Sequence, residues 1–191
     1  MSITSITEVH RLEPIIIVPY DSNWMTQFQE IGGLIRSALR EHAIRIDHIG
    51  STSIKGLDAK PIIDIQISVQ SLEPVNIYQS LLEHIGFAYR CDNPDQSKRY
   101  FRESPGNKRI HIHVRESGSW SEQFALLFRD YMRSNEGDCR NYAALKYKLA
   151  ESFRNDRHNY VNAKEPFIWE AMKRASSWSQ DIGWRPAKSD I

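Results

Sequence analysis

The sequence has few of the features that mark secreted, zinc-knuckle or membrane-spanning proteins. It contains two cysteines, Cys91 and Cys139, among 191 residues, which is too few for a disulfide framework and lacks the close spacing of a metal knuckle. The longest aliphatic run covers residues 15–18, whereas a membrane span needs about 20 apolar residues. The first 14 residues lack the basic start and apolar stretch of a secretion signal. We therefore expect a cytoplasmic protein that does not associate with membranes.

An excess of either charge is also absent. The chain has 25 Lys plus Arg against 24 Asp plus Glu, which gives a formal net charge of +1. A nucleic-acid partner is not expected, because binding a polyanion across a whole surface requires a basic excess. The 40% hydrophobic and 26% charged residues are typical of a globular domain, and the length is enough to bury one core. Neither a P-loop lysine pattern nor a dinucleotide glycine fingerprint occurs.

Hydrophobic periodicity predicts an α/β (α+β) fold with three segments. Residues 1–14 show no sustained period and are predicted to form a flexible lead, residues 15–178 one domain, and residues 179–191 a C-terminal tail. The aliphatic run at residues 15–18 and segments near residues 44, 62, 87, 98 and 109 predict strands. Helical spacing predicts a helix after Asp21, one after Pro74 and three after Gly118. We expect a mixed sheet flanked by helices, with a C-terminal helical portion.

The most informative segment combines a turn of small residues with a carboxylate in the following strand. The chain reads HIGSTS at residues 48–53 and KPIIDIQI at residues 60–67. If Gly50 and Ser51 open a turn, its backbone N–H groups and the hydroxyls of Ser51 and Ser53 can hold phosphate oxygens. Strand alternation places Asp64 on the face opposite the aliphatic residues, where a cation can reach it. The alternative is a capped turn and a carboxylate balanced by an arginine or by backbone amides.

These two motifs, with HIHV at residues 111–114 and FRDYMRSN at residues 128–135, resemble the GrpB family, which is also found fused to dephospho-coenzyme A kinases. The resemblance covers roughly residues 15–178. It implies a fold similar to the nucleotidyltransferases related to DNA polymerase β, whose signature is Gly-Ser followed by a strand with two alternating acids. Gly50 and Ser51 match the nucleotide cradle, and Asp64 matches the first metal-binding acid. Gln66 stands at the place of the second acid, which puts standard two-metal nucleotidyl transfer in doubt.

A second strand carries two histidines on one face. Residues 109–115 alternate polar and apolar side chains, so His111 and His113 project to the same side. If this strand neighbours the one bearing Asp64, the three residues form a site with two nitrogens and one oxygen. Such a set favours Zn²⁺, Mn²⁺ or Fe²⁺ over Mg²⁺. We therefore predict a divalent metal cofactor, Mg, Mn or Zn. The alternative is a solvated or hydrogen-bonded strand face beside arginines.

Positively charged residues gather around the same predicted strands. The candidates for binding phosphate are Lys60, Arg99, Arg102 and Arg109. Their guanidinium and ammonium groups are suited to a phosphorylated ligand, and the family resemblance adds Lys146 and Lys164. Taken without the motifs, such a cluster is more often a solvated surface.

Together these residues predict a metal-dependent nucleotidyl- or phosphoryl-transferase that acts on a small molecule, with a nucleotide or phosphorylated small molecule as its partner. Asp64 is the predicted catalytic residue. The alternative is a catalytically inactive nucleotide- or metabolite-binding accessory module, which is consistent with Gln66. A third reading is a scaffold that uses the C-terminal helices as a partner surface. A Ser/His/Asp hydrolase is disfavoured because Ser51 lacks the G-x-S-x-G elbow.

Overall fold

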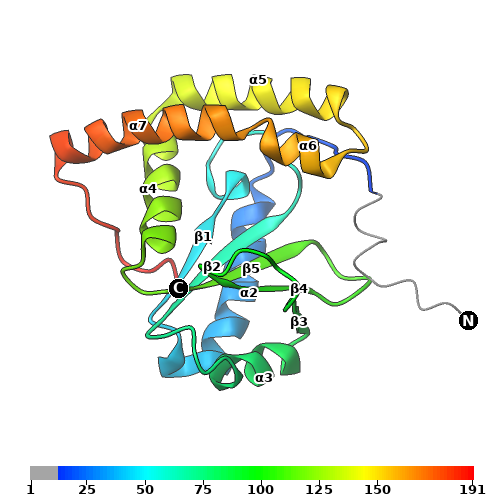
Figure 1. Cartoon of the computed structure of the whole chain (residues 1–191), viewed down its shortest axis with the longest axis vertical. Helices are drawn as coiled ribbons and strands as arrows, with labels where there is room; N and C mark the ends of the chain where they lie inside the picture. The colour runs from blue at the N-terminus through cyan, green and yellow to red at the C-terminus, as the bar shows by residue number, and fades with distance from the viewer. Residues whose placement is uncertain (1–12) are drawn as a thin grey trace, which may run out of the picture.

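The computed structural model describes residues 13–191, so most of the expected N-terminal lead lies outside the described residues. A five-stranded mixed sheet has the order β1-β2-β5-β4-β3, with helices on both faces (Figure 1). This confirms the α+β expectation. The strands are β1 (Arg45–Ile49), β2 (Ile63–Val69), β3 (Phe87–Tyr89), β4 (Arg99–Glu103) and β5 (Ile110–Glu116). The helices are α2 (Asn23–Leu39), α3 (Asn76–His84), α4 (Trp120–Ser134), α5 (Glu136–Ser152), α6 (Arg157–Asn162) and α7 (Glu165–Ile182).

The centre of the sheet is the parallel pair β2 and β5. Strand β2 also pairs antiparallel with β1, and β5 pairs antiparallel with β4. The chain from β2 to β5 passes through α3 and the β3–β4 hairpin. In the β2–β5 register, Asp64 lies opposite His111 and Gln66 lies opposite His113. The condition on which the predicted three-residue cluster depended, neighbouring strands, is therefore met.

Strand alternation gives the sheet one apolar and one polar face. In β2 the buried aliphatic residues are Ile63, Ile65, Ile67 and Val69, which belong to the main core with Phe28 and Leu39 of α2 and Leu82 of α3. Burying this surface favours folding by roughly 25 cal/mol per Å². The intervening residues of β2 point to the other face. The polar face, which carries Asp64 and Gln66, is therefore presented toward the C-terminal helices.

Helices α4, α5 and α7 build a second core. It includes Leu57 from the loop before β2, Tyr131 and Met132 of α4, and Ala171 of α7. Pro166 lies in the first turn of α7 and does not kink a longer helix, as expected for a residue that lacks an N–H group. Across residues 13–191, no helix has both the length and the hydropathy needed to cross a membrane.

The strand expected at residues 15–18 is wrong. This segment forms one isolated bridge, between Val18 and Ala59. Its apolar side chains are instead used against the helices, because Ile15 packs with Leu149 and Tyr160. A short run of aliphatic residues fits a buried strand and a buried crossing segment equally well, so its period alone could not distinguish them.

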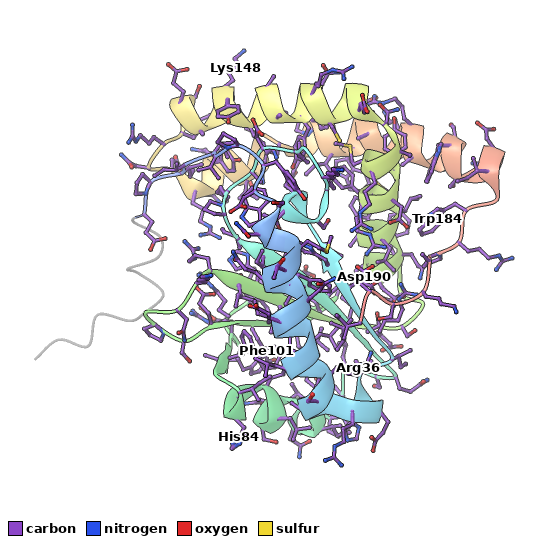
Figure 2. The ribbon with its side chains drawn as sticks, turned by 180° about the vertical axis from the view of Figure 1, so that it is seen from behind. Arg36, His84, Phe101, Lys148, Trp184 and Asp190 are labelled. Atoms are coloured by element: carbon purple, nitrogen blue, oxygen red, sulfur yellow. The ribbon has the colours of Figure 1, made fainter. Side chains whose placement is uncertain are left out.

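The last eight residues run along the outer edge of β1. The Ile46 N–H donates to Ser189 Oγ over 2.8 Å, and the His48 N–H donates to Asp190 Oδ2 over 3.0 Å. Arg36 of α2 donates to the backbone oxygen of Ile191 over 3.1 Å; Figure 2 labels Arg36 and Asp190 from behind the molecule. Edge strands expose unpaired backbone groups, and residues 184–191 satisfy several of them here.

Behind β1, one arginine is surrounded by acids. Arg129 of α4 is 1% exposed, and its guanidinium lies 2.8 Å from Asp130, 3.0 Å from Asp190 and 3.4 Å from Asp47. Asp47 is itself fully buried. Asp47 also pairs with Arg45 over 2.9 Å, so without Arg129 this buried carboxylate depends on one cation. Removing a partner from a buried ion-pair network is far more costly than losing an exposed pair.

We expect Arg129→Met to lower the free energy of unfolding by about 3–5 kcal/mol, measured by urea denaturation at neutral pH. The matched control is Arg140→Met, because Arg140 forms an exposed ion pair with Glu136. That variant should change stability by about 0.5 kcal/mol or less. A loss below about 1 kcal/mol for Arg129→Met would show that Asp47 does not depend on the buried arginine.

Candidate functional site

A pocket of about 510 Å³ opens on the polar face of the sheet, between the strands and helices α5 and α6. Asp64 of β2 and the two histidines of β5 lie in its wall. The polar residues that line it are Ser51, Thr52, Lys60, Asp64, Asn93, Lys98, Tyr100, His111, His113, Lys146, Arg157, Tyr160 and Lys164. Sheet residues therefore form one side of the pocket, and basic residues from the C-terminal helices form another.

Asp64, His111 and His113 come together, as predicted on the condition that their strands are neighbours. Asp64 Oδ1 lies 3.1 Å from His111 Nδ1 and 3.5 Å from His113 Nε2. One ligand atom from each residue can be chosen so that all three lie within 4.8 Å of one another. The Tyr100 ring packs against both imidazoles, with centroid distances of 5.6 and 5.3 Å. The β2–β5 register sets this cluster, and Tyr100 of β4 fixes the ring positions.

The protonation states of the cluster suit a metal ion. Burial opposes ionisation of Asp64, but its hydrogen bonds with His111 and His113 outweigh this and hold the Asp64 pKa below its usual range. Burial lowers the pKa of His111, and it lowers the pKa of His113 to about 4 despite the attraction of Asp64. At neutral pH the cluster is thus one carboxylate and two uncharged imidazoles, the forms that bind metals.

The other two imidazole nitrogens distinguish a metal-type site from a hydrogen-bond network in which every polar atom has a partner. His111 Nε2 and His113 Nδ1 are buried and have no hydrogen-bond partner among residues 13–191. Each ring therefore reaches Asp64 with one nitrogen and leaves the other unpaired. Buried polar groups without partners are uncommon and often mark functional sites. Two imidazole nitrogens and a carboxylate oxygen fit a borderline ion such as Zn²⁺ or Mn²⁺.

Gly50 is required by the position of Asp64. Its φ of +70° and ψ of −174° lie in a region that is nearly restricted to glycine. A Cβ atom at Gly50 would lie 2.5 Å from Asp64 Oδ2 and 3.0 Å from Asp64 Cβ. The carboxylate therefore packs directly on the Gly50 backbone. The sequence motif brought Gly50 and Asp64 together for phosphate and metal binding, and the structure adds this direct contact.

The two serines of the turn after Gly50, both predicted to bind phosphate, differ in position. Residues Ser51–Ser53 form a short 3₁₀ turn, and Ser51 lines the pocket. Ser53 is 3% exposed, and its hydroxyl donates to the Gly50 carbonyl over 2.6 Å. Ser53 thus closes the turn and lies outside the pocket lining.

Thr52 and His48 support the turn from behind. The Thr52 hydroxyl donates to the Ile62 carbonyl over 2.9 Å, so His48 Nε2, at 3.1 Å, is the donor to Thr52 Oγ1. The His48 ring stacks on Phe28 with a centroid distance of 4.7 Å. Burial lowers the pKa of His48 to about 3, and the ring is neutral in the folded protein.

The structure divides the predicted phosphate-binding cations into two groups. Lys60 lines the pocket, whereas Arg99, Arg102 and Arg109 do not. Arg99 lies 2.7 Å from Glu73, and Arg102 lies 2.7 Å from Glu103. Arg109 pairs with Glu13 and lies 3.4 Å from Glu103. These three guanidinium groups are already paired with acids that do not line the pocket.

Sequence reasoning from residues alone missed several members of the site, among them Tyr100 of β4 and Arg157 and Tyr160 of α6. Lys60 Nζ lies 4.9 Å and Lys164 Nζ 4.8 Å from the centre of the Tyr160 ring, within the range of a cation–π contact. Helix α6 spans only residues Arg157–Asn162, too short for a clear helical period. The clustering of Lys164, His158 and Arg157 around one aromatic residue was the available signal.

Burial and neighbouring cations disfavour the charged forms of Lys60 and Lys146 in the pocket. Burial, reinforced by Arg157 and Lys164, lowers the pKa of Lys60 to about 7. Burial, with Lys164 again contributing, lowers the pKa of Lys146 to about 7. In the described part of the chain, no carboxylate forms an ion pair with Lys60, Arg157 or Lys164. The pocket therefore has unbalanced positive charge next to a metal-type cluster.

Comparison with known proteins gives one family. The model of the GrpB protein family matches residues 14–174. The UPF0157 protein BH1888 of Halalkalibacterium halodurans is 36% identical over 163 residues, which cover 85% of this chain and 83% of that protein. The crystal structure of the conserved protein GrpB from Enterococcus faecalis superposes with a TM-score of 0.78 and 32% identity, covering 85% of this chain and 99% of that one.

A dephospho-CoA kinase of Mycobacterium tuberculosis is 32% identical over 198 residues. The match covers 91% of this chain, which spans about half of the kinase, 49% of its length. Two solved structures share the fold at low identity. The GLD-2/RNP-8 complex matches with a TM-score of 0.54 and 10% identity over 76% of this chain and 58% of that one. The structure of Cid1 poly(U) polymerase matches with a TM-score of 0.50 and 13% identity, over 76% of this chain and 46% of that one. The nucleotidyltransferase-like architecture is thereby confirmed.

We expect Gly50→Ala to weaken Mn²⁺ binding by at least about tenfold, because the added Cβ displaces the Asp64 carboxylate. Gly56→Ala is the matched control: Gly56 also has a positive φ, of +79°, but no atom lies within 4 Å of an added Cβ. Both variants should lose about 1 kcal/mol or more of stability from backbone strain. Equal Mn²⁺ affinity of the two variants by calorimetry would contradict the role of the Gly50 contact.

Acid should destabilise the fold through His48. Its pKa is about 3 when folded and near 6.5 when unfolded, so the unfolded chain binds the extra proton between these values. The contribution of His48 to stability therefore levels off above pH 6.5 and falls below it. From pH 6.5 to 5 we expect His48 to contribute a loss of about 1.5 kcal/mol. Urea denaturation of His48→Gln should show a correspondingly weaker pH dependence, whereas exposed His84→Gln should retain the wild-type slope.

Proposed function

This chain belongs to the GrpB family, and we propose that it is a metal-dependent nucleotidyl- or phosphoryl-transferase that acts on a small molecule. The observation that carries the proposal is the position of Asp64, His111 and His113 in the wall of a pocket. Among the described residues, the basic side chains Lys60, Arg157 and Lys164 of that pocket form no ion pair, whereas Lys98 pairs with Asp95 over 3.1 Å. This arrangement lies on a nucleotidyltransferase-like fold. Function is argued from the site, because one fold can host many activities.

The charge of the pocket favours a polyanionic ligand. Lys60, Arg157 and Lys164 approach one another without a carboxylate among the described residues to balance them. Phosphate oxygens would supply the missing negative charge through charge-assisted hydrogen bonds. Lys146, whose ammonium group donates to the Asp58 carbonyl, stands at the same wall. A nucleotide or another phosphorylated small molecule is the ligand class that fits.

The residues of the sheet would bind and orient the reacting end of that ligand. Asp64, His111 and His113 would hold a divalent ion, which when bound neutralises phosphate charge and polarises a phosphoryl oxygen. The Ser51 hydroxyl lines the same pocket and can donate to a phosphate oxygen. Lys60 and Lys164 lie over the Tyr160 ring. Their ammonium groups can bind the phosphates that do not react and so keep the ligand in the pocket.

One observation favours a second candidate, a catalytically inactive nucleotide- or metabolite-binding accessory module. Gln66 offers an amide where the polymerase β signature has its second acid, and it is fully buried. A related segment occupies about half of the mycobacterial dephospho-CoA kinase, which is compatible with an accessory role there. Binding would persist in such a module, and consumption of the nucleotide would not.

The test is a calorimetric titration of metal-stripped protein with a panel of nucleoside triphosphates plus Mn²⁺. We expect the wild-type protein to bind a triphosphate saturably, and more tightly when Mn²⁺ is present. Asp64→Asn should abolish this effect of Mn²⁺. Lys164→Gln should weaken binding by about tenfold, equivalent to ~1.4 kcal/mol. The control is Lys173→Gln, because Lys173 is exposed and pairs with Glu170.

Release of pyrophosphate or phosphate in the same samples separates the two candidates. Metal-dependent release that requires Asp64 supports the transferase, and binding without release supports the accessory module. If folded wild-type protein binds none of the triphosphates, the proposed nucleotide site is wrong.

A further inference from the structure

Two residues beyond Asp64, strand β2 carries an amide that is held away from the pocket. Gln66 is fully buried. Its Nε2 donates to the backbone oxygen of Glu122 in α4 over 3.5 Å, and its Oε1 accepts a hydrogen bond from Arg115 Nη1. Gln66 is not part of the pocket lining. Its side chain is therefore committed to α4 and β5.

The partner of Gln66 is a charged group without a charged partner. Arg115 follows His113 by two positions on β5 and lies on the same face of the sheet. In the range 13–191 no carboxylate forms an ion pair with it, and its Nε is buried without a hydrogen-bond partner. Burial lowers the Arg115 pKa to about 10, so the guanidinium remains positive at neutral pH.

The nearby acid Glu122 is used elsewhere. Its carboxylate accepts hydrogen bonds from the Ser68 hydroxyl and from the Gly118 N–H. Among the described residues, the Gln66 amide is thus the group that contacts Arg115 directly, while Asp95, Asp64 and Glu122 act on its charge without an ion-pair contact. A fixed positive charge next to His113 remains on the polar face of the sheet.

Acidic ligands for a second metal ion are absent at this place. Among the described residues that line the pocket, Asp64 is the one carboxylate. Holding two divalent ions a few ångströms apart requires several carboxylates that share their charge. Here the next positions on the same face of the sheet are Gln66 on β2 and Arg115 on β5, and a guanidinium repels a second cation.

We propose that this site holds a single divalent cation, on Asp64, His111 and His113, and that Arg115, positioned by Gln66, provides the fixed positive charge beside it. The inference deepens the proposed function and rests on it for the role of the ion. The number of ions does not depend on turnover. Arg115 is outside the pocket lining, so it is not a ligand of the ion and acts on it through its charge.

The first test counts bound metal in the full-length, metal-stripped protein. Mn²⁺ is titrated while free Mn²⁺ is followed by electron paramagnetic resonance, with and without a non-hydrolysable nucleoside triphosphate analogue. We expect one Mn²⁺ per chain in the protein alone and one per chain–analogue complex, lost in Asp64→Asn. Two Asp64-dependent ions, or none, would overturn the inference. If the analogue fails to bind while one ion binds, the proposed function fails and the single-ion site stands.

The second test addresses Arg115. Arg115→Gln removes the neighbouring charge, so Mn²⁺ should bind at least about threefold more tightly. Arg115→Lys keeps the charge and should retain wild-type affinity. The double variant Gln66→Glu/Arg115→Gln frees a carboxylate and should increase affinity further or add a second ion. Affinity of folded Arg115→Gln within about 1.5-fold of wild type would show that the guanidinium does not act on the ion.

Discussion

The site depends on the parallel pairing of β2 with β5. This register places Asp64 opposite His111 and brings His113 within reach of the same carboxylate oxygen. The pairing is held by the apolar face of the same two strands, which packs on α2 and α3. A shift by one residue would move the whole aliphatic set out of the core. The energy of the core therefore fixes the geometry of the polar cluster on the opposite face.

The sequence predicted which side chains share a face, because strand alternation is strict. The period of two in residues 109–115 and in the strand after Pro61 was enough to group His111 with His113 and to direct Asp64 away from the aliphatic face. It could not establish that the two strands are neighbours, since they are separated by a helix and a hairpin. The close contact between Gly50 and Asp64 was likewise beyond it, because a close approach of backbone and side chain leaves no periodic signal.

For the basic residues, the sequence predicted more cations at the site than the structure has there. Arg99, Arg102 and Arg109 are near the histidines in sequence, yet they form ion pairs with Glu73, Glu103 and Glu13. Glu73 and Glu13 are distant along the chain from their partners, so local charge density overestimated the number of cations available to a ligand. The unpaired cations come instead from Lys60 and from the helical segment that contains α6. Which charges are neutralised is decided by tertiary packing, and the local sequence does not report it.

The sheet and the C-terminal helices meet at the pocket, and each contributes one kind of chemistry. The sheet provides a carboxylate and two neutral imidazoles, and the C-terminal helices provide ammonium and guanidinium groups. Burial and neighbouring cations lower the pKa values of Lys60 and Lys146 to about 7. An anion between the two walls favours protonation of these lysines, so anion binding and proton uptake are linked. A ligand that contacts both walls also stabilises their packing, because it binds the folded state alone.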